Sequence, residues 1–377
     1  MSVWVNWPGR KARWHFAHNP WRKAVRCLPL PGLIDVHVHL RDPGATHKED
    51  FSTGTAAALA GGVVAVLDMP NNTPPTVNGQ SLSEKAQIAS QKARCDFGFY
   101  LGATEDNVGD GAILSHRVAG LKIYMGQTYG PLKMADLAAL IAHFRSWSAA
   151  RPIAVHAEGL AMAGAIALAR LYGKQLHICH VSRKAEIELI RKAKESWSAT
   201  GLTCEVTPHH LFLTQADAAR LGNLAHVKPP LGTEEDRAAL WDNLDIVDVI
   251  ASDHAPHTIA EKEGIEPPPG VPGLETTLPL LLTAVADGRL SWERLIELTA
   301  ENPARIFSLK RDERTYIEVD PDDRYVLDGL SLKTKCGWTP FEGMTVQGRV
   351  VKVYLRGTLA YADGQVLVQP GFGRALF

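Results

Sequence analysis

The sequence predicts a (β/α)8 barrel, or TIM barrel, with a small β-strand appendage, and three observations carry this prediction. Eight short apolar runs, rich in β-branched residues, alternate with longer segments of helical periodicity. The runs begin roughly 23 to 33 residues apart except before the last, which is the spacing of βα units in a barrel. After about residue 315, the helical periodicity gives way to alternating strands.

The barrel strands are expected where the apolar runs lie, at 32–40, 63–70, 96–103, 119–126, 152–158, 176–182, 203–210 and 247–254. The clearest helical segments are 81–94, 134–146, 159–172, 183–196 and 291–303. An open, doubly wound sheet is the alternative architecture. It needs a glycine-rich phosphate turn or a clear switch point, and the sequence shows neither.

The chain is expected to divide into a basic N-terminal extension at 1–31, a barrel at 32–314 and a small β appendage at 315–377. Residues 1–34 carry six basic residues, four Trp and no acidic residue. Such a leader can be a mitochondrial transit peptide, but Pro8, Pro20 and the low serine content favour a surface strand or extension. The appendage strands are clearest at 345–368, and the N-terminal extension is a candidate to join their sheet.

The composition argues against several functional classes. The 377 residues carry 40 Lys plus Arg against 41 Asp plus Glu, so the net charge of −1 offers no basic surface for nucleic acid or anionic lipid. Apolar residues make up 45% of the chain, but no window approaches the roughly 18 consecutive apolar residues of a membrane span. The five cysteines are scattered without a CxxC pair, which favours a reducing, cytoplasmic compartment.

Histidines and one aspartate gather at the ends of four predicted strands. His37 and His39 end the first strand and, being two residues apart, point to the same face. His156, His180 and Asp253 end the fifth, sixth and eighth strands, at the barrel mouth where active sites lie. Each histidine alone could be a hydrogen-bonded core residue, but four of them at one mouth favour a nitrogen and oxygen site that suits zinc.

Lys122 lies inside the apolar run 119–126, where an unpaired ammonium would cost several kcal/mol. One interpretation is a snorkelling lysine whose charged end reaches solvent. The other is a neutral amine that reacts with CO2 and becomes a carbamate able to bridge two metals. Four histidines and one aspartate exceed the needs of a single catalytic zinc, and a bridging carbamate between two metals resolves that excess.

Six motifs resemble those of the cyclic amidohydrolases, and most closely those of the dihydroorotases. The motifs are GLIDVHVHLRDPG, DMPNNTPP, the GLK of the fourth strand, HAE, CHVS and SDHAPH. The similarity runs from residue 31 to the C-terminal strands. It is closest to the dihydroorotase domain of the multifunctional pyrimidine-synthesis protein of animals, notably in THKEDF, TCEVTPHHLFL, PPPGVPGLETTLPLLLTA and WTPFEGMTV.

The resemblance implies which residues form the site. A centre of two zinc ions would be held by His37, His39, carboxylated Lys122, His156, His180 and Asp253. The substrate would be bound by Arg41, Asn71, His257, Pro272 and Gly273, beneath a flexible loop with Thr128 and Tyr129. A cation and neutral donors suit dihydroorotate and N-carbamoyl-L-aspartate, which carry a free carboxylate. Related hydantoinases, dihydropyrimidinases and allantoinases usually lack an arginine at the position of Arg41.

The sequence departs from the resemblance at two positions and leaves three residues open. Lys228 stands where the animal domain has Arg and bacterial relatives have Asn. Tyr129 stands where Phe is expected, although its apolar ring can still cover the site. Cys179 is expected to point away from the ligand-bearing face and to pack. Cys179, Glu205 and His210 remain candidates for an additional metal ligand or for support of the ligands.

The implied activity is that of a dihydroorotase, which reversibly closes N-carbamoyl-L-aspartate to (S)-dihydroorotate and water in pyrimidine (UMP) biosynthesis, with Asp253 moving the proton. The alternatives are another cyclic amidase and a catalytically inactive dihydroorotase-like assembly subunit. The intact set of metal-site residues argues against the inactive subunit. The implied partners are a second copy in a homodimer and aspartate carbamoyltransferase or carbamoyl phosphate synthetase; neither nucleic acid nor a membrane is expected.

Overall fold

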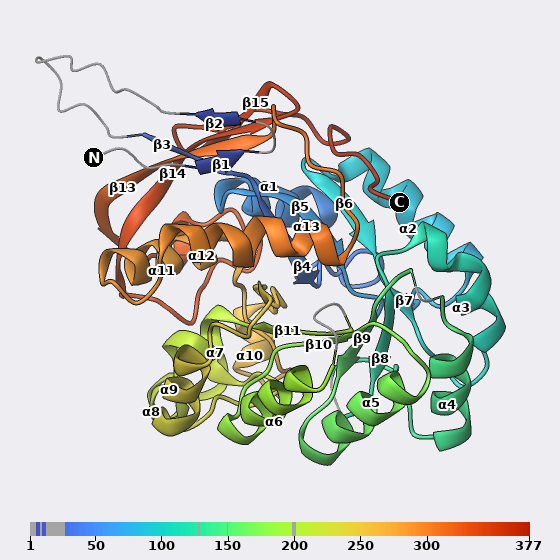
Figure 1. Ribbon diagram of the computed structural model, residues 1–377. Coiled ribbons are helices and arrows are strands. Elements are labelled where there is room, and N and C mark those ends of the chain that lie inside the picture. The colour runs from blue at the N-terminus through green and yellow to red at the C-terminus, as the bar shows by residue number, and fades with distance from the viewer. Residues whose placement is uncertain (1–4, 8–9, 13–26, 127–128, 149, 198–200) are drawn as a thin grey trace, which may run out of the picture.

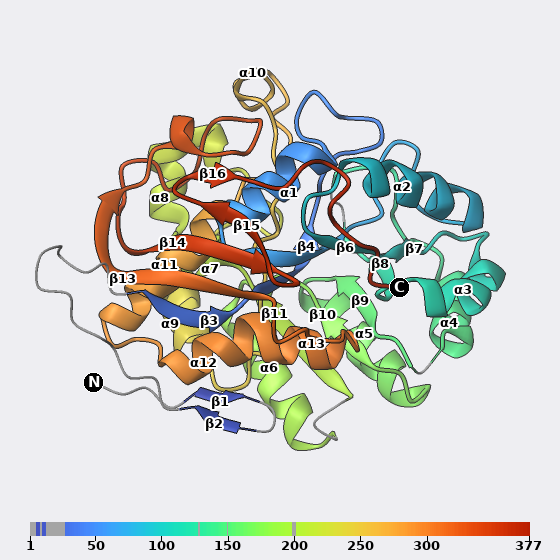
Figure 2. The ribbon, with the colours of Figure 1, turned by 90° about the horizontal axis from the view of Figure 1, so that it is seen from above.

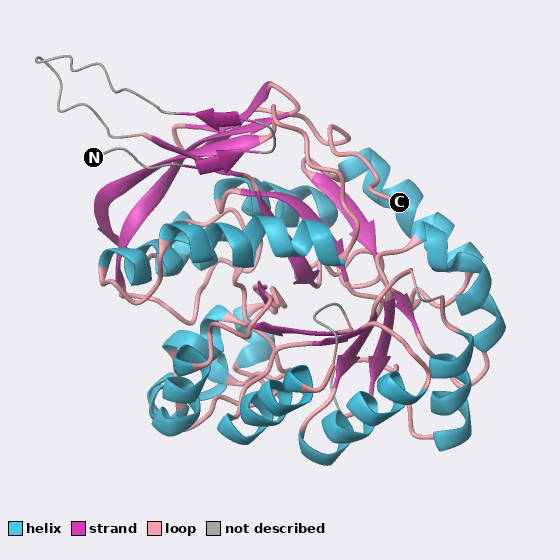
Figure 3. Cartoon of the chain, in the orientation of Figure 1, coloured by secondary structure: helices cyan, strands magenta, loops and turns pink. Residues whose placement is uncertain are grey.

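Eight parallel strands form the centre of the molecule, and helices surround them (Figures 1 and 3). The computed structural model describes residues 5–7, 10–12, 27–126, 129–148, 150–197 and 201–377. Its barrel strands are β4 (Leu33–Val38), β5 (Val63–Asp68), β6 (Asp96–Phe99), β7 (Leu101–Gly102), β8 (Leu121–Tyr124), β9 (Ile153–His156), β10 (Leu176–Ile178), β11 (Leu202–Val206) and β12 (Val249–Ile250). Each expected apolar run contains one of these strands, or in one case two.

Two connections turn these strands into a closed barrel. β6 and β7 are one strand interrupted at Tyr100, since β6 pairs with β5 and β7 pairs with β8. At the other seam, Val38 forms a parallel bridge with His254, and the His39 N–H donates to the His254 carbonyl at 2.8 Å. The predicted (β/α)8 barrel is therefore confirmed.

The helices follow the barrel strands along the chain and cover the outside of the barrel (Figure 1). They are α1 (Phe51–Ala60), α2 (Gly79–Lys92), α3 (Val108–Leu114), α4 (Leu137–Ser146), α5 (Gly159–Leu171), α6 (Lys184–Glu195), α7 (Pro208–Phe212), α8 (Gln215–Leu221), α9 (Glu234–Asp242), α10 (Ile259–Lys262), α11 (Leu274–Ala286), α12 (Trp292–Ile296) and α13 (Asn302–Ile306). All five predicted helical segments are present. The one expected at 291–303 is divided into α12, a π-helical turn (Glu297–Glu301) and α13.

The appendage is a five-stranded antiparallel sheet with the order β16-β15-β14-β13-β3 (Figure 2). Its strands are β3 (Leu28–Pro31), β13 (Tyr316–Val326), β14 (Thr345–Leu355), β15 (Thr358–Ala362) and β16 (Gln365–Val366). β3 comes from the predicted N-terminal extension, as expected, and pairs with β13. The domain boundaries at 31 and 314 stay a prediction. Apart from a short hairpin of β1 (Val5–Trp7) and β2 (Arg10–Ala12), the preceding residues lie outside the described chain.

Gly32 joins the appendage to the barrel at a point without room for a side chain. A Cβ at this position would lie 2.6 Å from the Val64 side chain, closer than non-bonded carbons approach. The absence of a Cβ therefore lets β3 continue directly into β4 while the chain passes from one sheet to the other.

An apolar plug fills the barrel below the mouth. Tyr100 and Phe307 are fully buried and meet edge to face at 6.0 Å, and the Tyr100 hydroxyl donates to the Val36 carbonyl at 3.0 Å. This packing closes the barrel interior beneath the polar strand ends at the mouth. Among the described residues, no helix has the length and apolar content needed to cross a bilayer.

The pairing of β3 with β13 predicts a stability contribution from the N-terminal segment. Leu30 is 2% exposed and packs in the main core, so Leu30→Ala should lower the free energy of unfolding by about 2 to 5 kcal/mol. Denaturant unfolding monitored by circular dichroism measures this change. Leu330→Ala is the control, because Leu330 is 87% exposed and its truncation should have little effect. Equal effects of both substitutions would contradict the packing of β3.

Candidate active site

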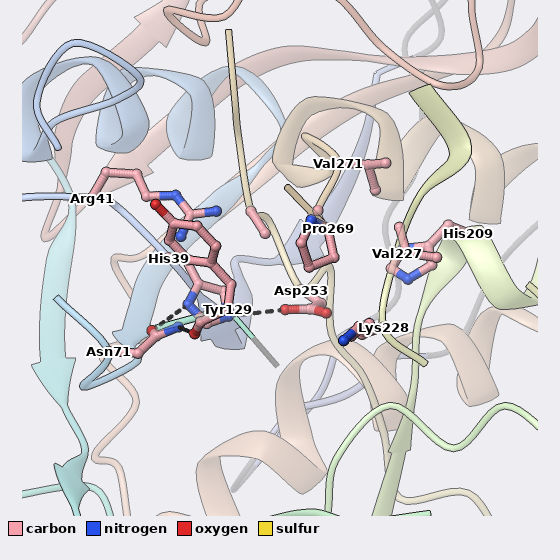
Figure 4. A pocket seen from close by; sticks show the side chains of 12 residues that line it. His39, Arg41, Asn71, Tyr129, His209, Val227, Lys228, Asp253, Pro269 and Val271 are labelled. Atoms are coloured by element: carbon pink, nitrogen blue, oxygen red, sulfur yellow. Dashed lines mark hydrogen bonds and ion pairs between the residues drawn. The ribbon is translucent and has the colours of Figure 1, made fainter. Parts of the chain in front are cut away.

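The two histidines of the first barrel strand converge on one aspartate. The Nε2 atoms of His37 and His39 lie 3.2 and 3.1 Å from Asp253 Oδ1. Behind them, His37 Nδ1 contacts Glu205 Oε1 at 2.5 Å, and His39 Nδ1 contacts Asn71 Oδ1 at 2.8 Å. Each ring is thus held from the rear by an oxygen, and its other nitrogen faces the centre of the mouth (Figure 4, which labels His39, Asn71 and Asp253).

The hydrogen bonds of Asn71 fix the tautomer of His39. The Asn71 amide nitrogen donates to the Tyr129 carbonyl at 3.0 Å, so its Oδ1 is the atom that faces His39. His39 Nδ1 must therefore donate. Burial is the main cause that lowers the pKa of His39, to about 4, so the ring is neutral. Because Nδ1 carries the hydrogen, the lone pair on Nε2 faces the Asp253 carboxylate. A lone pair directed at a carboxylate oxygen calls for a cation between them.

His37 occupies a site that attracts positive charge. Burial alone would lower its pKa, but the carboxylates of Glu205 and Asp253 outweigh burial and raise that pKa to about 10. In turn, burial would raise the pKa of both carboxyl groups, but nearby histidines, His37 foremost, hold each well below its usual range. Two ionised, buried carboxylates around one imidazole therefore favour a cation at this point.

His156 and His180 complete the mouth with nitrogens that have no protein partner. His156 Nδ1 lies 2.9 Å from His180 Nε2. Their other ring nitrogens are buried without a hydrogen-bond partner in the described part of the chain. Burial lowers the pKa of both rings, that of His156 to about 3, so both are neutral. A neutral imidazole has one N–H and one lone pair, so the ring that donates the hydrogen bond between them keeps a lone pair on its other nitrogen. A metal ligand requires such a lone pair.

Lys122 is fully buried beside these histidines and contacts no carboxylate among the described residues. Its Nζ lies 2.9 Å from Cys179 Sγ and 5.2 Å from the centre of the Tyr124 ring. The snorkelling interpretation is therefore wrong. A buried amino group without an anionic partner is costly, and a chemical modification that supplies its own negative charge is compatible with this position.

The expectation that Cys179 points away from the ligands was also wrong. β10 ends at Ile178, and His180 has a φ of 36°, so the alternation of a regular strand no longer holds there. Cys179 consequently faces the barrel interior beside Lys122. The sulfur lies within reach of His37 and Glu205, and the potential ligand atoms of these three residues are within 4.8 Å of one another.

Three residues at the mouth have left-handed backbone conformations. Arg41 has a φ of 63°, His180 of 36° and Asp253 of 46°. Such conformations cost free energy in residues with a Cβ, and they persist where the surrounding structure holds them. Each residue directly follows or nearly follows a barrel strand, where the unusual φ turns its side chain toward the mouth.

A pocket adjoins the histidine cluster. Its lining consists of His39, Arg41, Asn71, Tyr129, His209, Val227, Lys228, Asp253, Ala255, Pro269, Gly270 and Val271 (Figure 4). Arg41 is 5% exposed, and its Nε donates to the Pro256 carbonyl at 3.1 Å. Within the described chain, no carboxylate pairs with its guanidinium. The pocket therefore offers a buried, uncompensated positive charge, which suits an anionic ligand group.

The structure places His257 behind Arg41 and not on the pocket lining. His257 Nε2 lies 3.0 Å from Arg41 Nη2, and its Nδ1 lies 3.1 Å from Lys48 Nζ. Lys48 also contacts the Tyr129 hydroxyl at 3.1 Å and Glu261 at 2.9 Å. Lys48 is not among the site residues predicted from the sequence, although it lies within the motif THKEDF. The tyrosine hydroxyl at position 129 thus has a partner that phenylalanine could not use; Thr128 lies outside the described residues.

Pro272 and Gly273, which the sequence predicts to bind substrate, do not line the pocket beside Arg41. Pro269 and Gly270 line the pocket, whereas Pro272 and Gly273 line a separate hollow with His254. The Gly273 N–H donates to His254 Nδ1 at 3.1 Å, which commits this backbone to supporting the barrel seam. The segment PPPGVPG contains two Pro-Gly pairs, and its sequence alone does not reveal which one faces inward.

Glu205 holds residues of the histidine cluster, whereas His210 is turned away from the cluster. Besides His37, Glu205 accepts hydrogen bonds from the His180 N–H and from His177, both at 3.1 Å. His210 contacts Thr207 Oγ1 at 2.7 Å and the Pro229 carbonyl at 3.0 Å, so neither ring nitrogen is left for a metal. The neighbouring His209 lines the pocket instead, and its Nε2 has no partner in the described residues.

Comparison with known proteins agrees with this geometry. The sequence profile described as the amidohydrolase family matches residues 29–359. The chain belongs to the amidohydrolase family. It is 51% identical over 350 residues to the multifunctional protein CAD of Squalus acanthias, covering 93% of this chain and 16% of that protein. It is also 39% identical over 362 residues to the dihydroorotase of Pyrococcus abyssi, covering 90% of this chain and 85% of that enzyme.

Solved structures share the fold over nearly the whole chain. The L-hydantoinase of Arthrobacter aurescens superposes with a TM-score of 0.88 at 28% identity, covering 93% of this chain and 89% of that one. The inactive dihydroorotase-like domain of the Chaetomium thermophilum CAD-like multifunctional protein superposes with a TM-score of 0.80 at 28% identity, covering 93% of this chain and all of that domain. The chain spans about one sixth of the multifunctional relative named above.

The role of Glu205 leads to a testable prediction about metal affinity. Glu205→Gln removes the negative charge that holds His37, so the affinity for zinc should fall about 10- to 100-fold. Competition with a fluorescent chelator measures this affinity. Glu186→Gln is a control, because Glu186 is also buried but accepts from the backbone amides of Gly159 and Ser182 and touches no candidate ligand. Unchanged zinc affinity in Glu205→Gln would contradict its supporting role.

Proposed function

We propose that this chain is a dihydroorotase, a hydrolase of cyclic amides that interconverts N-carbamoyl-L-aspartate and (S)-dihydroorotate in pyrimidine biosynthesis. The observation that carries the proposal is the buried Arg41, which pairs with no carboxylate of the described residues and lies beside the cluster of histidines around Asp253. The cluster suits amide chemistry, and Arg41 selects for a substrate with a carboxylate. The identity to the Pyrococcus abyssi dihydroorotase over most of both chains supports the same assignment.

The donor set fits two zinc ions. The proposed ligands are the residues expected from the sequence, namely His37, His39, His156, His180, Asp253 and Lys122. Lys122 would help to hold the ions as a carbamate, which forms when its amino group adds to CO2 with formation of an N–C bond and release of a proton. Bound zinc supplies Lewis acidity, which polarises a carbonyl and lowers the pKa of water. Two observations on the described residues support this assignment: His156 and His180 each have a buried ring nitrogen without a hydrogen-bond partner, and no carboxylate pairs with Lys122.

Asp253 is the proposed acid and base. Its pKa is held well below the usual range because nearby histidines, His37 and His39 above all, outweigh the effect of burial, so it is ionised at neutral pH. In the hydrolytic direction, Asp253 takes a proton from the attacking water and delivers it to the ring nitrogen as the carbon–nitrogen bond breaks. In the synthetic direction, it takes the proton from that nitrogen and returns it to the departing water.

Arg41 and Asn71 are proposed to hold the substrate carboxylate and the ring. His257 fixes the guanidinium from behind, and Tyr129 lies against Arg41, with the guanidinium carbon 5.3 Å from its ring centre. Tyr129 is thus able to exclude water from the bound substrate. Lys228 lines the same pocket and adds a second cation there, for which the free carboxylates of N-carbamoyl-L-aspartate are suitable partners.

Two alternatives are less consistent with the site. Similarity to the L-hydantoinase fold supports another cyclic amidase, but an uncharged hydantoin ring gains nothing from the buried charge of Arg41. Similarity to the inactive dihydroorotase-like domain supports an assembly subunit without activity. The complete donor set in this chain argues against that subunit role.

The oligomeric state, partners and location are further proposals. We propose a homodimer, because the outer face of α5 exposes Leu160 and Leu171 (92% and 72%) on an otherwise apolar helix. Association with aspartate carbamoyltransferase or carbamoyl phosphate synthetase is proposed by analogy with the multifunctional relatives, which extend far beyond this chain. A cytoplasmic location is proposed from the cysteine content.

An assay of the purified chain tests the function directly. Dihydroorotate, hydantoin and allantoin should be offered separately, with metal analysis of the same sample. We expect turnover of dihydroorotate alone, in protein that carries about two zinc ions per chain. Preferential turnover of hydantoin or allantoin would identify another cyclic amidase, and metal-loaded protein that turns over none of the three would support the inactive subunit.

Asp253→Asn should preserve the fold and lose proton transfer. The expected fall in kcat is at least about 100-fold, as for removal of a general acid and base. Because Asp253 is also a proposed ligand, the rate should be measured per bound metal. Near-normal turnover of metal-loaded Asp253→Asn would assign the proton transfer to another group.

Arg41→Gln should separate substrates by their charge. We expect kcat/KM for dihydroorotate to fall at least about 100-fold, because the substrate carboxylate would lose its buried partner. Any activity on uncharged hydantoins should change much less. Arg41→Lys should restore only part of the loss, since a point charge does not reproduce the planar guanidinium. An equal fall for both substrate types would show that Arg41 supports the metal site or the loop and not the carboxylate.

A further inference from the structure

Lys262, the last residue of α10, is a fully buried lysine whose charged end meets three backbone carbonyls and an aromatic ring of the described chain. Its Nζ donates to the carbonyls of His226 at 2.9 Å, Pro268 at 3.0 Å and Gly270 at 3.0 Å. No carboxylate within the described ranges pairs with it. The three N–H groups of the ammonium are thus matched one to one by three carbonyl oxygens.

These carbonyls belong to two loops that are far apart in the sequence. One loop is 226–228, and the other is 267–271. The loops also contact each other, since the Gly270 N–H donates to the His226 carbonyl at 2.9 Å and His226 Nδ1 contacts the Pro267 carbonyl at 2.8 Å. Lys262 lies at the point where the loops meet.

Both loops line the pocket beside Arg41. Val227 and Lys228 come from the first loop, and Pro269, Gly270 and Val271 come from the second, so together they supply five of the 12 lining residues (Figure 4). Lys262 itself does not reach the pocket. A change in the distance between the loops would change the shape of this wall of the pocket.

We propose that Lys262 is a positioning residue for substrate binding: its ammonium ties loops 226–228 and 267–271 together and so sets the wall that the substrate meets. The proposal rests on the proposed function, because that function defines the substrate. It assigns a role to a residue that contacts neither the substrate nor the proposed metal ligands. The expected signature is a change in KM without a comparable change in kcat.

The charge state of Lys262 matters, because a neutral amine has only two N–H groups for three carbonyls. Burial, and then the nearby charge of Arg41, lower the pKa of Lys262 to about 8. The other titratable groups around it do not restore a negative partner. Glu261 is engaged by Lys48 at 2.9 Å, and burial lowers the pKa of both His226 and His257, which are neutral.

Lys262→Met tests the tie, since methionine keeps the apolar stem but has no donor. With dihydroorotate as substrate, we expect KM to rise about 10-fold while kcat per bound zinc changes less than about threefold. A merely structural lysine would lower the thermal midpoint and the fraction of active protein but leave KM unchanged. Lys174→Met is the matched control, because Lys174 Nζ also donates to a backbone carbonyl, that of Trp147 at 2.6 Å, on a loop that does not line the pocket. Its KM should stay at the wild-type value.

Two readouts keep the test decisive if Lys262→Met folds poorly. In the wild type, KM for hydrolysis should rise above about pH 8, as the ammonium loses one of its three N–H groups, and in Lys262→Met this rise should be absent. Hydrogen exchange should also be faster in Lys262→Met at the backbone amides of residues 226–228 and of Gly270 and Val271, with no change around His37; the prolines at 267–269 have no amide hydrogen.

The results for Lys262 and those for dihydroorotate turnover test two separate proposals. A wild-type KM that is flat from pH 7 to 9, or a wild-type KM value in active Lys262→Met, would overturn the positioning role. Failure of the wild type to turn over dihydroorotate would instead overturn the proposed function. In that case, hydrogen exchange alone still decides whether Lys262 ties the loops, because it needs no substrate.

Discussion

The seam between the first and last barrel strands is the constraint on which the site depends. The His39 N–H donates to the His254 carbonyl at 2.8 Å, and the buried Asp35 carboxylate accepts from the Ser252 N–H at 3.2 Å. These contacts join segments more than 200 residues apart and bring Asp253 between His37 and His39. Without this closure, the carboxylate would lie on one edge of an open sheet and the histidine pair on the other.

Closure of the barrel brings the histidines together but does not orient their rings, and a site needs rings with fixed orientations. Glu205 and Asn71 supply them for His37 and His39, and the left-handed backbone at His180 turns that side chain inward. Buried side chains behind the pocket orient its lining residues in the same manner. Lys48 and His257 hold Arg41 and Tyr129 from behind, so the substrate side and the ligand side are both built on buried polar contacts.

Much of this could be predicted from the sequence, since strand periodicity and spacing reveal both the barrel and which side chains end its strands. The five histidine and aspartate positions follow from that logic, and so does the joining of the N-terminal segment to the appendage. The direction of Cys179 did not follow, because a single left-handed residue breaks the alternation. Lys48 and Lys262 were missed because they occur in polar segments that look solvated, and only the tertiary structure buries them. The choice between Pro269–Gly270 and Pro272–Gly273 depends on the path of a loop, which periodicity does not describe.

The central claim, that the histidine cluster around Asp253 is a metal centre for dihydroorotate hydrolysis, is tested most directly by metal removal and return. The purified chain should be stripped with a chelator and then titrated with zinc while dihydroorotate turnover is followed. Stripped protein should be folded and inactive, and activity should return with added zinc and reach a plateau near two zinc ions per chain. Full activity in metal-free protein would contradict the claim.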